Sequence, residues 1–356
     1  MHLGWQGASL PVPAGERALV RDATWCRDRW LVVGATADAH GTTKPAVWSS
    51  VDGAVWRPVE LDPRRDFYAG SEILGSVGCR GGRAAVLGAK SGGAHGNPRV
   101  ATWRQRPDGS LVVVSAAFEQ YGGPNAISVN RLVGGPAGYL IAGTRSSGAA
   151  VWSSPTGARF TLREGAPGLA DTPAADTQAL DAVWWRGSWT VVGNSIVAQG
   201  RLVATTWTGT GPGRWTPSRL PGDTGPTSGD RVVLTGAGPA VVGTFDDSFA
   251  VWTDHAGRWT RESTFGQRDA DAHSAAYVSG LAWTGFSLAT TYSDGTTYRM
   301  AVGPAAGLER VPLPAAVAVE GDQAVTVAAH GPALLLLTDD AEQGRVWLTH
   351  VPAPTS

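Results

Sequence analysis

The chain repeats one short pattern along most of its length: an apolar run ending in glycine, a variable loop, and then a word that contains tryptophan. The glycines that end the apolar runs are Gly34, Gly88, Gly143, Gly193 and Gly243, at spacings of 54, 55, 50 and 50 residues. Short runs rich in Val, Thr and Trp between glycine turns, at this period, are typical of one four-stranded β-blade per repeat. The repeat therefore predicts an all-β propeller.

The tryptophan words give the number of blades. They contain Trp48, Trp103, Trp152, Trp207, Trp252 and Trp347, and the last gap, of 95 residues, is about two periods long. A degenerate repeat fits inside this gap, with 287–290 and 298–301 in place of the two words. We therefore predict a seven-bladed β-propeller of four-stranded antiparallel blades, forming a single domain over 1–356. Its blades should cover roughly 20–61, 72–115, 127–164, 177–219, 228–263, 275–312, and 323–350 together with 4–11.

The seventh repeat has room for only three strands, because only 351–356 follow its third. The N-terminal stretch 4–11 is similar to 56–61, which we take as the fourth strand of the first repeat. We predict that the N-terminal strand joins the last blade and closes the ring. Closure leaves no exposed inner edge, which is how a ring of sheets avoids edge-to-edge aggregation.

Tryptophan dominates the aromatic content, with 16 Trp beside six Tyr and seven Phe. A tryptophan that recurs at one phase in blade after blade is expected in the core rather than on a ligand platform. The net charge is −1 with 17% charged residues, which leaves no electrostatic footprint for nucleic acid. Lys44 and Lys90 are the only lysines, which together with the many Ala and Gly residues indicates a bacterial coding bias. No run of 18 apolar residues predicts a transmembrane segment.

The two cysteines lie at equivalent places in neighbouring blades. Cys26 and Cys79 precede Gly34 and Gly88 by 8 and 9 residues. They could form a disulfide between blades, and the alternative is two buried free thiols. A disulfide favours an extracytoplasmic protein, secreted or lipid-anchored, whose leader is absent from this chain; the alternative is a cytoplasmic protein.

Residues 50–56 resemble the Asp-box turn of bacterial BNR-like, sialidase-like propellers, which has the form Ser-x-Asp-x-Gly-x-x-Trp. Here the Asp and Gly are adjacent, so the match is imperfect. The resemblance implies a structural hairpin between third and fourth strands, formed by Ser50, Asp52, Gly53 and Trp56. In it the Asp side chain caps turn N–H groups and the Trp packs beneath, which implies a fold rather than catalysis.

The chain lacks the features of a true sialidase. That family has an Arg-Ile-Pro-like element near its N-terminus, and no Ile in this chain follows an Arg. Seven repeats also disagree with the six-bladed sialidase ring. Sequences of the Gly-x-Ser-x-Gly, His-Glu-x-x-His, Walker and Cys-x-x-Cys types are absent as well, so no catalytic residue is assigned.

In an antiparallel blade, the second-to-third loops and the connections between blades share one face of the ring. We call this the loop face, and its longer, more varied segments make it the expected binding surface. His40 and His95 each lie 8 residues before their blade's Trp, so they could share a ligand or metal; the alternative is duplicated loops with solvent-facing imidazoles. Other candidates in the connections are Arg65, Asp66, Tyr68, Glu119, Tyr121, Arg268, Asp269, Asp271 and His273.

The alternating acids near Asp269 could bind Ca²⁺, but we favour the alternative of a solvated loop, and we expect no other cofactor. The leading hypothesis is a non-catalytic, exported, monomeric propeller that binds a protein or glycan partner through the loop face. The alternative is a carbohydrate-active hydrolase or lyase at the channel mouth, built from His40, His95, Asp269, Asp271 and His273. That enzyme needs an acid and a histidine within hydrogen-bond reach of each other. A purely structural subunit is the third hypothesis.

Overall fold

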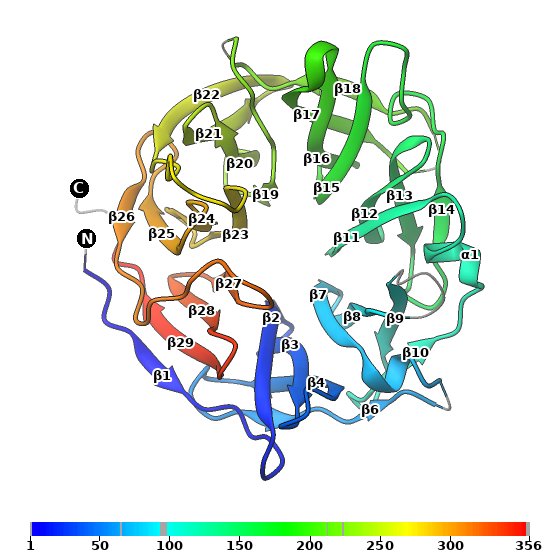
Figure 1. Cartoon of the computed structure of the whole chain (residues 1–356), viewed down its shortest axis with the longest axis vertical. Helices are drawn as coiled ribbons and strands as arrows, with labels where there is room; N and C mark the ends of the chain where they lie inside the picture. Colours follow the sequence, from blue (N-terminus) through cyan, green and yellow to red (C-terminus); the bar gives the residue numbers. More distant parts are fainter. Residues whose placement is uncertain (1, 65, 93–97, 212, 223, 354–356) are drawn as a thin grey trace.

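The strands form seven sheets arranged in a ring, with the sequence running once around it (Figure 1). The computed structural model describes residues 2–64, 66–92, 98–211, 213–222 and 224–353. Each sheet is one blade, and its strands succeed one another from the central axis outward. The predicted all-β, seven-bladed propeller is confirmed. No helix in these described ranges is long and apolar enough to cross a membrane.

Blade 1 contains β2 (Arg17–Cys26), β3 (Arg29–Ala37), β4 (Thr43–Ser50) and β5 (Arg57–Pro58). Blade 2 contains β7 (Ile73–Arg80), β8 (Arg83–Lys90), β9 (Arg99–Gln105) and β10 (Leu111–Val114). Blade 3 contains β11 (Ala126–Gly135), β12 (Gly138–Arg145), β13 (Gly148–Ser154) and β14 (Thr161–Arg163). Blade 4 contains β15 (Asp176–Trp185), β16 (Ser188–Val197), β17 (Arg201–Gly209) and β18 (Thr216–Arg219). Blade 5 contains β19 (Arg231–Leu234), β20 (Pro239–Phe245), β21 (Ser248–His255) and β22 (Arg258–Phe265). Blade 6 contains β23 (Tyr277–Trp283), β24 (Leu288–Ser293), β25 (Tyr298–Gly303) and β26 (Glu309–Val311). Blade 7 contains β27 (Ala324–His330), β28 (Ala333–Asp339), β29 (Gly344–His350) and β1 (Gln6–Ala8).

The recurring tryptophans lie in the third strands and pair with the apolar runs of the second strands. Trp48 lies opposite Val32, and Trp152 lies opposite Ile141. Five of these side chains are at most 1% exposed: Trp48, Trp103, Trp152, Trp207 and Trp252. Burying an indole removes roughly 150–250 Å² from water. The expectation that these residues form the core is confirmed for these five, whereas Trp347 is only partly buried against the core between blades 6 and 7.

The glycine that ends each apolar run allows a close approach to the innermost strand of the same blade. A Cβ on Gly34 would lie 1.8 Å from the backbone oxygen of Leu19, and one on Gly193 would lie 1.9 Å from that of Gln178. The innermost strands have a β-bulge at this level, for example between Val20 and Asp22. The bulge brings the two backbones together, so only glycine fits opposite it.

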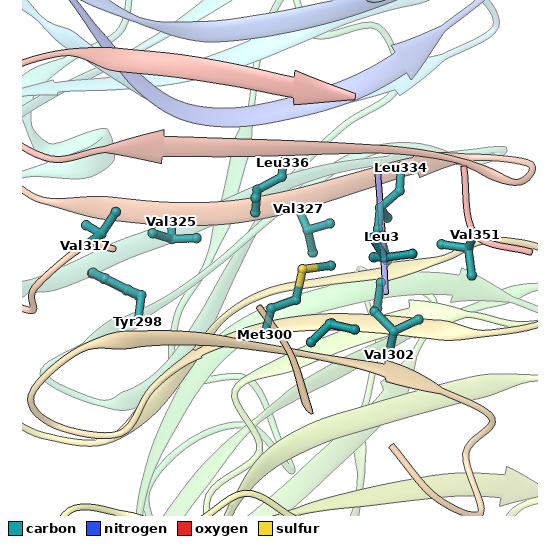
Figure 2. Packing of buried hydrophobic residues seen from close by; sticks show 13 residues of the cluster. Leu3, Tyr298, Met300, Val302, Val317, Val325, Val327, Leu334, Leu336 and Val351 are labelled. Carbon is teal, nitrogen blue, oxygen red and sulfur yellow. The ribbon is translucent and has the colours of Figure 1, made fainter. Parts of the chain in front are cut away.

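The N-terminal strand closes the ring as predicted. Strand β1 pairs antiparallel with β29, and Gly7 lies opposite Trp347. Leu3 precedes β1 and Val351 follows β29 in the sequence. Both are buried in the core between blades 6 and 7, near Met300 (Figure 2). Burial of one such Leu or Met side chain stabilises the fold by roughly 1.5–3 kcal/mol. Both ends of the chain therefore contribute to the last interface.

Two details refine the predicted repeats. The degenerate sixth repeat forms an ordinary blade, in which β24 pairs with β25 as the two replacement words require. The first blade ends earlier than expected, because β5 has only two residues and ends at Pro58. The chain then crosses to blade 2, where β6 (Leu61–Asp62) pairs in parallel with β10. Placing Leu61 in the fourth strand of blade 1 was therefore wrong, since its backbone pairs with the outer edge of blade 2.

Cys26 and Cys79 form a disulfide that joins the innermost strands of blades 1 and 2, with their Cα atoms 5.5 Å apart. The predicted disulfide is confirmed over the alternative of two thiols. Since the strands end there, the bond lies on the face opposite the loop face, among the first-to-second and third-to-fourth turns. We call this the hairpin face.

The turn between β4 and β5 has the contacts that the Asp-box resemblance implies. Asp52 Oδ1 accepts hydrogen bonds from the backbone N–H groups of Ala54 and Val55, both at 2.9 Å. These bonds, together with one from Ser50, lower the pKa of Asp52 to about 2. The buried Trp56 donates its indole N–H to the backbone oxygen of Gly53. These four residues therefore stabilise a hairpin.

Candidate functional site

Two connections between blades place functional side chains side by side on the loop face. The first leads from β6 through a 3-10 turn, η1 (Ala69–Ser71), into β7. Asp66 Oδ1 accepts hydrogen bonds from the backbone N–H groups of Tyr68 and Ala69, which stabilises the start of this turn. The second connection leads from β10 through the short helix α1 (Phe118–Tyr121) into β11.

A cleft of about 180 Å³ lies between these connections and the start of β9. We call it the blade 2 cleft. Its lining combines aromatic, cationic and acidic side chains on a small apolar base. The lining residues are Asp66, Tyr68, Glu72, Pro98, Arg99, Val100, Ala101, Val114, Ala116, Ala117, Phe118, Tyr121 and Gly122.

Arg99 lies against two aromatic rings at the cleft. Its guanidinium carbon is 4.2 Å from the ring centroid of Phe118 and 5.2 Å from that of Tyr68. Phe67 packs edge-on against Tyr68, with 5.5 Å between ring centroids. Phe67 and Phe118 are nevertheless 77% and 46% exposed. Cation–π contacts hold the guanidinium in place while exposed aromatic surface remains beside it.

Glu72 is fully buried beneath this aromatic group. Its Oε2 accepts a hydrogen bond of 3.0 Å from the indole N–H of Trp103, whereas its buried Oε1 has no hydrogen-bond partner among the residues that the structure describes. Burial raises the pKa of Glu72 to about 7, and nearby Asp66 adds to this, although the bond from Trp103 opposes it. The carboxyl is pressed against Gly88, where a Cβ would lie 2.5 Å from Oε2.

Tyr121 forms the base of the cleft and belongs mostly to the core. Its hydroxyl lies 3.4 Å from Thr102 Oγ1, and its ring packs against Trp152. Burial raises the pKa of Tyr121 to about 12. Glu119 is exposed on α1 and does not line the cleft. The cleft thus brings together three of the predicted residues, Asp66, Tyr68 and Tyr121.

Only one member of the predicted histidine pair lies among the described residues. His40 is exposed in the loop between β3 and β4, where its backbone N–H bonds to Asp38. His95 and Arg65 fall outside the described residues. A site shared by His40 and His95 therefore stays a prediction.

The acidic cluster near Asp269 lies in the connection between blades 5 and 6, away from the blade 2 cleft in the ring (Figure 1). Asp269 accepts hydrogen bonds from the backbone N–H of Asp271 and from the hydroxyl of Thr296. Arg268 and Asp269 line a separate hollow of about 280 Å³, which Asp271 and His273 do not line. No set of three or more His, Cys, Asp or Glu side chains placed to hold a metal occurs in the part of the chain that the structure describes.

The acid and histidine that an enzyme at the channel mouth needs are not in contact. Among the described residues, the imidazoles of His40 and His273 make no hydrogen bond or ion pair with Asp269 or Asp271. The described members of the proposed catalytic group therefore do not form an acid and base pair, and its fifth member, His95, lies outside the described residues.

Sequence reasoning missed a ring of polar residues on the innermost strands. Asp22 accepts a hydrogen bond from the backbone N–H of Val77, in the next blade. Asp181 and Asp230 do the same for Val232 and Val278. The sequence held a sign of this ring. In five blades a polar residue lies 12 residues before the glycine that ends the second-strand apolar run: Asp22, Ser76, Arg131, Asp181 and Arg231.

Three charges of this inner ring, those of Asp22, Arg131 and Asp181, are paired with one another. Arg131 lies between Asp22 and Asp181, with N–O distances of 3.1 and 3.4 Å. Desolvation disfavours the charged guanidinium, but the two carboxylates hold the pKa of Arg131 above its usual value. A hollow of about 420 Å³ lies here, lined in part by Arg21, Asn130 and Arg231. Paired charges that also hold neighbouring blades together indicate a structural role.

The hairpin face has the larger hollow, of about 500 Å³, beside the disulfide. Its lining includes four arginines and two acids, but no aromatic ring. Two of the arginines are paired, Arg29 with Asp28 and Arg106 with Asp62. The blade 2 cleft is the better candidate site despite its smaller volume, because it combines exposed rings with a buried acceptor that has no partner.

Comparison with known proteins shows the fold and no family. No protein-family model matches the chain, and no curated protein is detectably similar to it in sequence. Among solved structures, it is similar to the β-propeller domain of Cps50 (Swd1) from Myceliophteria thermophila, with 14% identity, a TM-score of 0.56, and coverage of 98% of this chain and 100% of that one.

Two other solved structures are comparably similar. The β-propeller domain of the Trilobed protease from Pyrococcus furiosus, which has an open velcro topology, gives 9% identity and a TM-score of 0.54 over 94% of this chain and 93% of that one. A protein of unknown function from Dyadobacter fermentans gives 12% identity and a TM-score of 0.50 over 98% of this chain and 100% of that one. At these identities the likeness shows a propeller fold alone.

Proposed function

We propose that this protein is a non-catalytic propeller that binds a glycan partner on the loop face, at the blade 2 cleft. The observation behind it is the Arg99 guanidinium held between Phe118 and Tyr68, beside exposed ring surface. Aromatic faces pack against the C–H faces of sugar rings, and a fixed guanidinium donates hydrogen bonds to sugar oxygens.

The size and charge of the cleft favour a neutral sugar. A volume of about 180 Å³ holds roughly six waters at about 30 Å³ each, which is comparable to one pyranose ring. The lining contains one arginine and two acids, so no excess of positive charge selects an anion. A protein partner would also use exposed aromatic and arginine side chains, and the test below separates the two classes.

The proposal includes an exported location. The Cys26–Cys79 disulfide is the supporting observation, because disulfides persist in oxidising compartments and are rare in the cytosol. An extracytoplasmic protein would also meet glycans of the cell surface directly.

A second candidate function is hydrolysis of the same glycan. The observation that favours it is Glu72, whose pKa of about 7 suits a general acid near neutral pH. Asp66 lines the same cleft and would be the second carboxylate. Asp66 is already engaged with two backbone N–H groups of η1, which is why binding without catalysis is preferred.

The test is binding of neutral hexasaccharides by isothermal titration calorimetry, using cellohexaose, laminarihexaose, xylohexaose and mannohexaose. We expect at least one to bind, and Phe118→Ala and Arg99→Ala each to weaken it by about tenfold or more. Arg268→Ala is the matched control, since Arg268 is an exposed arginine of another connection on the same face. Product analysis by mass spectrometry on the same samples tests the enzyme alternative.

Failure of all four sugars to bind would contradict the glycan proposal. Loss of binding in Arg268→Ala without loss in Arg99→Ala would contradict the assignment of the site to the blade 2 cleft. It would place the site between blades 5 and 6. A purified protein partner that binds in place of sugars, with the same dependence on Phe118, would show that the partner class is wrong.

A further inference from the structure

In three blades, the core tryptophan donates its indole N–H to a backbone oxygen of the incoming chain. Trp48 bonds to Pro11 at 2.8 Å, Trp152 to Gln120 at 2.6 Å, and Trp252 to Pro221 at 2.7 Å. A backbone carbonyl is a neutral acceptor, so it meets the need of the indole without burying a charge.

In blade 2 the core tryptophan has a different kind of hydrogen-bond acceptor. Trp103 donates to the side-chain oxygen Oε2 of Glu72 instead of to a backbone oxygen. Packing does not require an acid here, because a glutamine oxygen would accept the same bond. The second oxygen, Oε1, is buried without a partner, which is costly for any acceptor and most costly for a charged one. The contacts of Glu72 with the described residues therefore do not explain why an acid stands at this position.

The position of Glu72 indicates a use for the acid. It lines the blade 2 cleft together with Tyr68, Arg99 and Phe118. The cleft thus has exposed rings, a guanidinium donor and a buried acceptor within a volume suited to one sugar ring. Buried polar atoms without partners are rare in native proteins, and a bound ligand is one of the few ways to satisfy them.

We infer that Oε1 of Glu72 accepts a hydrogen bond from a hydroxyl of the sugar bound in the blade 2 cleft, and that this bond selects which sugar is bound. The inference rests on the proposed function and deepens it. A sugar without a hydroxyl at that place leaves the acceptor unpaired, so the site discriminates against it.

Ionisation of Glu72 is then linked to binding. The other charged or titratable side chains that line the cleft are Asp66, Tyr68, Arg99 and Tyr121. Since Trp103 engages Oε2, a proton on the carboxyl would reside on Oε1 and turn this acceptor into a donor. A ligand hydroxyl favours the carboxylate, so affinity should rise as the pH rises through about 7, with release of a proton on binding.

The experiment measures the affinity of the four hexasaccharides between pH 5.5 and 8.5, in buffers of different ionisation enthalpy, for the wild type and Glu72→Gln. For the wild type we expect binding about thirtyfold weaker at pH 5.5 than at high pH, from a single group that titrates near pH 7. Proton release should approach one per sugar near pH 6 and vanish at pH 8.5.

Glu72→Gln keeps an oxygen for Trp103 and places an NH₂ donor where Oε1 lies. We expect it to lose about ten- to a hundredfold in affinity at pH 8.5 and to show no pH dependence. Phe118→Ala is the matched control: it should weaken binding at every pH and keep the wild-type pH profile, because it removes a ring and leaves the carboxyl.

The two proposals fail in different ways. If a sugar binds and Phe118→Ala weakens it, but wild-type affinity does not change with pH or Glu72→Gln binds equally well, the role of Glu72 is wrong and glycan binding stands. If no sugar binds, or Phe118→Ala has no effect, the proposed function itself is wrong. The wild-type pH profile decides the question even if Glu72→Gln does not fold.

Discussion

At the scale of single residues, Glu72 has the most unusual environment in the cleft. It is fully buried, accepts one hydrogen bond from Trp103, and has a pKa raised to about 7. Its neutral form is thus favoured by the folded protein well above the pH at which an exposed glutamate ionises. The same property affects stability whether or not a ligand is present.

We expect stability to fall as the pH rises from about 4.5 to about 7. In this window the folded state holds a proton on Glu72 that the unfolded chain has released, so raising the pH favours unfolding; above about 7 the penalty is complete. A shift from 4.5 to about 7 corresponds to about 3 kcal/mol. Urea denaturation at pH 4.5 and pH 8 measures it, with Glu72→Gln as the control that lacks this slope. Equal slopes in the two proteins would contradict the prediction.

At the scale of strands and turns, the disulfide is a covalent cross-link between the innermost strands of blades 1 and 2. It joins Cys26 and Cys79, 53 residues apart in sequence, so it closes a loop that spans most of one repeat. Closing a loop of this length removes conformational freedom from the unfolded chain, in addition to any effect on the folded state.

Replacing both cysteines, Cys26→Ser with Cys79→Ser, should lower the free energy of unfolding by about 2–4 kcal/mol. Guanidinium denaturation of the variant and of the oxidised wild type measures the difference. The wild type in dithiothreitol is the control, since reduction should produce a similar loss without a substitution. An unchanged midpoint in both would mean that packing between blades 1 and 2 already provides this stability.

Repeated features were predictable from sequence, and unique ones were not. The core tryptophans, the closing strand and the paired cysteines each occur at a phase that the repeat defines, so their positions follow from the blade geometry. Asp66, Tyr68 and Tyr121 were found because polar and aromatic residues stand out in connections.

Glu72, Arg99 and Phe118 were missed because each occurs once. Arg99 is a charged residue at the start of β9, the third strand of blade 2, and Phe118 lies in a helix of a single turn. Their proximity depends on how two connections fold over β9, which has no period in the sequence. Glu72 could have been suspected from one sign: an acid directly before the apolar innermost strand of blade 2.

At the scale of the whole molecule, the ring is held together by blade-to-blade contacts at its centre. Asp22 connects three blades, because it belongs to blade 1, accepts from Val77 in blade 2, and pairs with Arg131 in blade 3. Through Arg131 the connection extends to Asp181 in blade 4. One side chain thus couples the blades that form and flank the cleft.

Asp22→Ala should destabilise the protein by about 3 kcal/mol, since it leaves the N–H of Val77 unpaired and Arg131 with one partner. The estimate is at the lower end for a buried pair because the Arg131 side chain is 24% exposed. Asp22→Asn should lose less, as its amide oxygen still accepts from Val77. Urea denaturation at pH 7 measures both, and a loss below about 1 kcal/mol for Asp22→Ala would show that the inner ring is not a stabilising network.

Closure by β1 also has a consequence for how the protein is made. Strand β1 acquires its neighbour late, because β29 is synthesised more than three hundred residues after it. Until then blade 7 lacks the strand that joins β28 to β1, so the edge of β28 is unpaired and able to pair with other chains. Nascent chains that stop before β29 therefore cannot complete the ring, and cellular proteases or chaperones can distinguish them from finished molecules by that open edge.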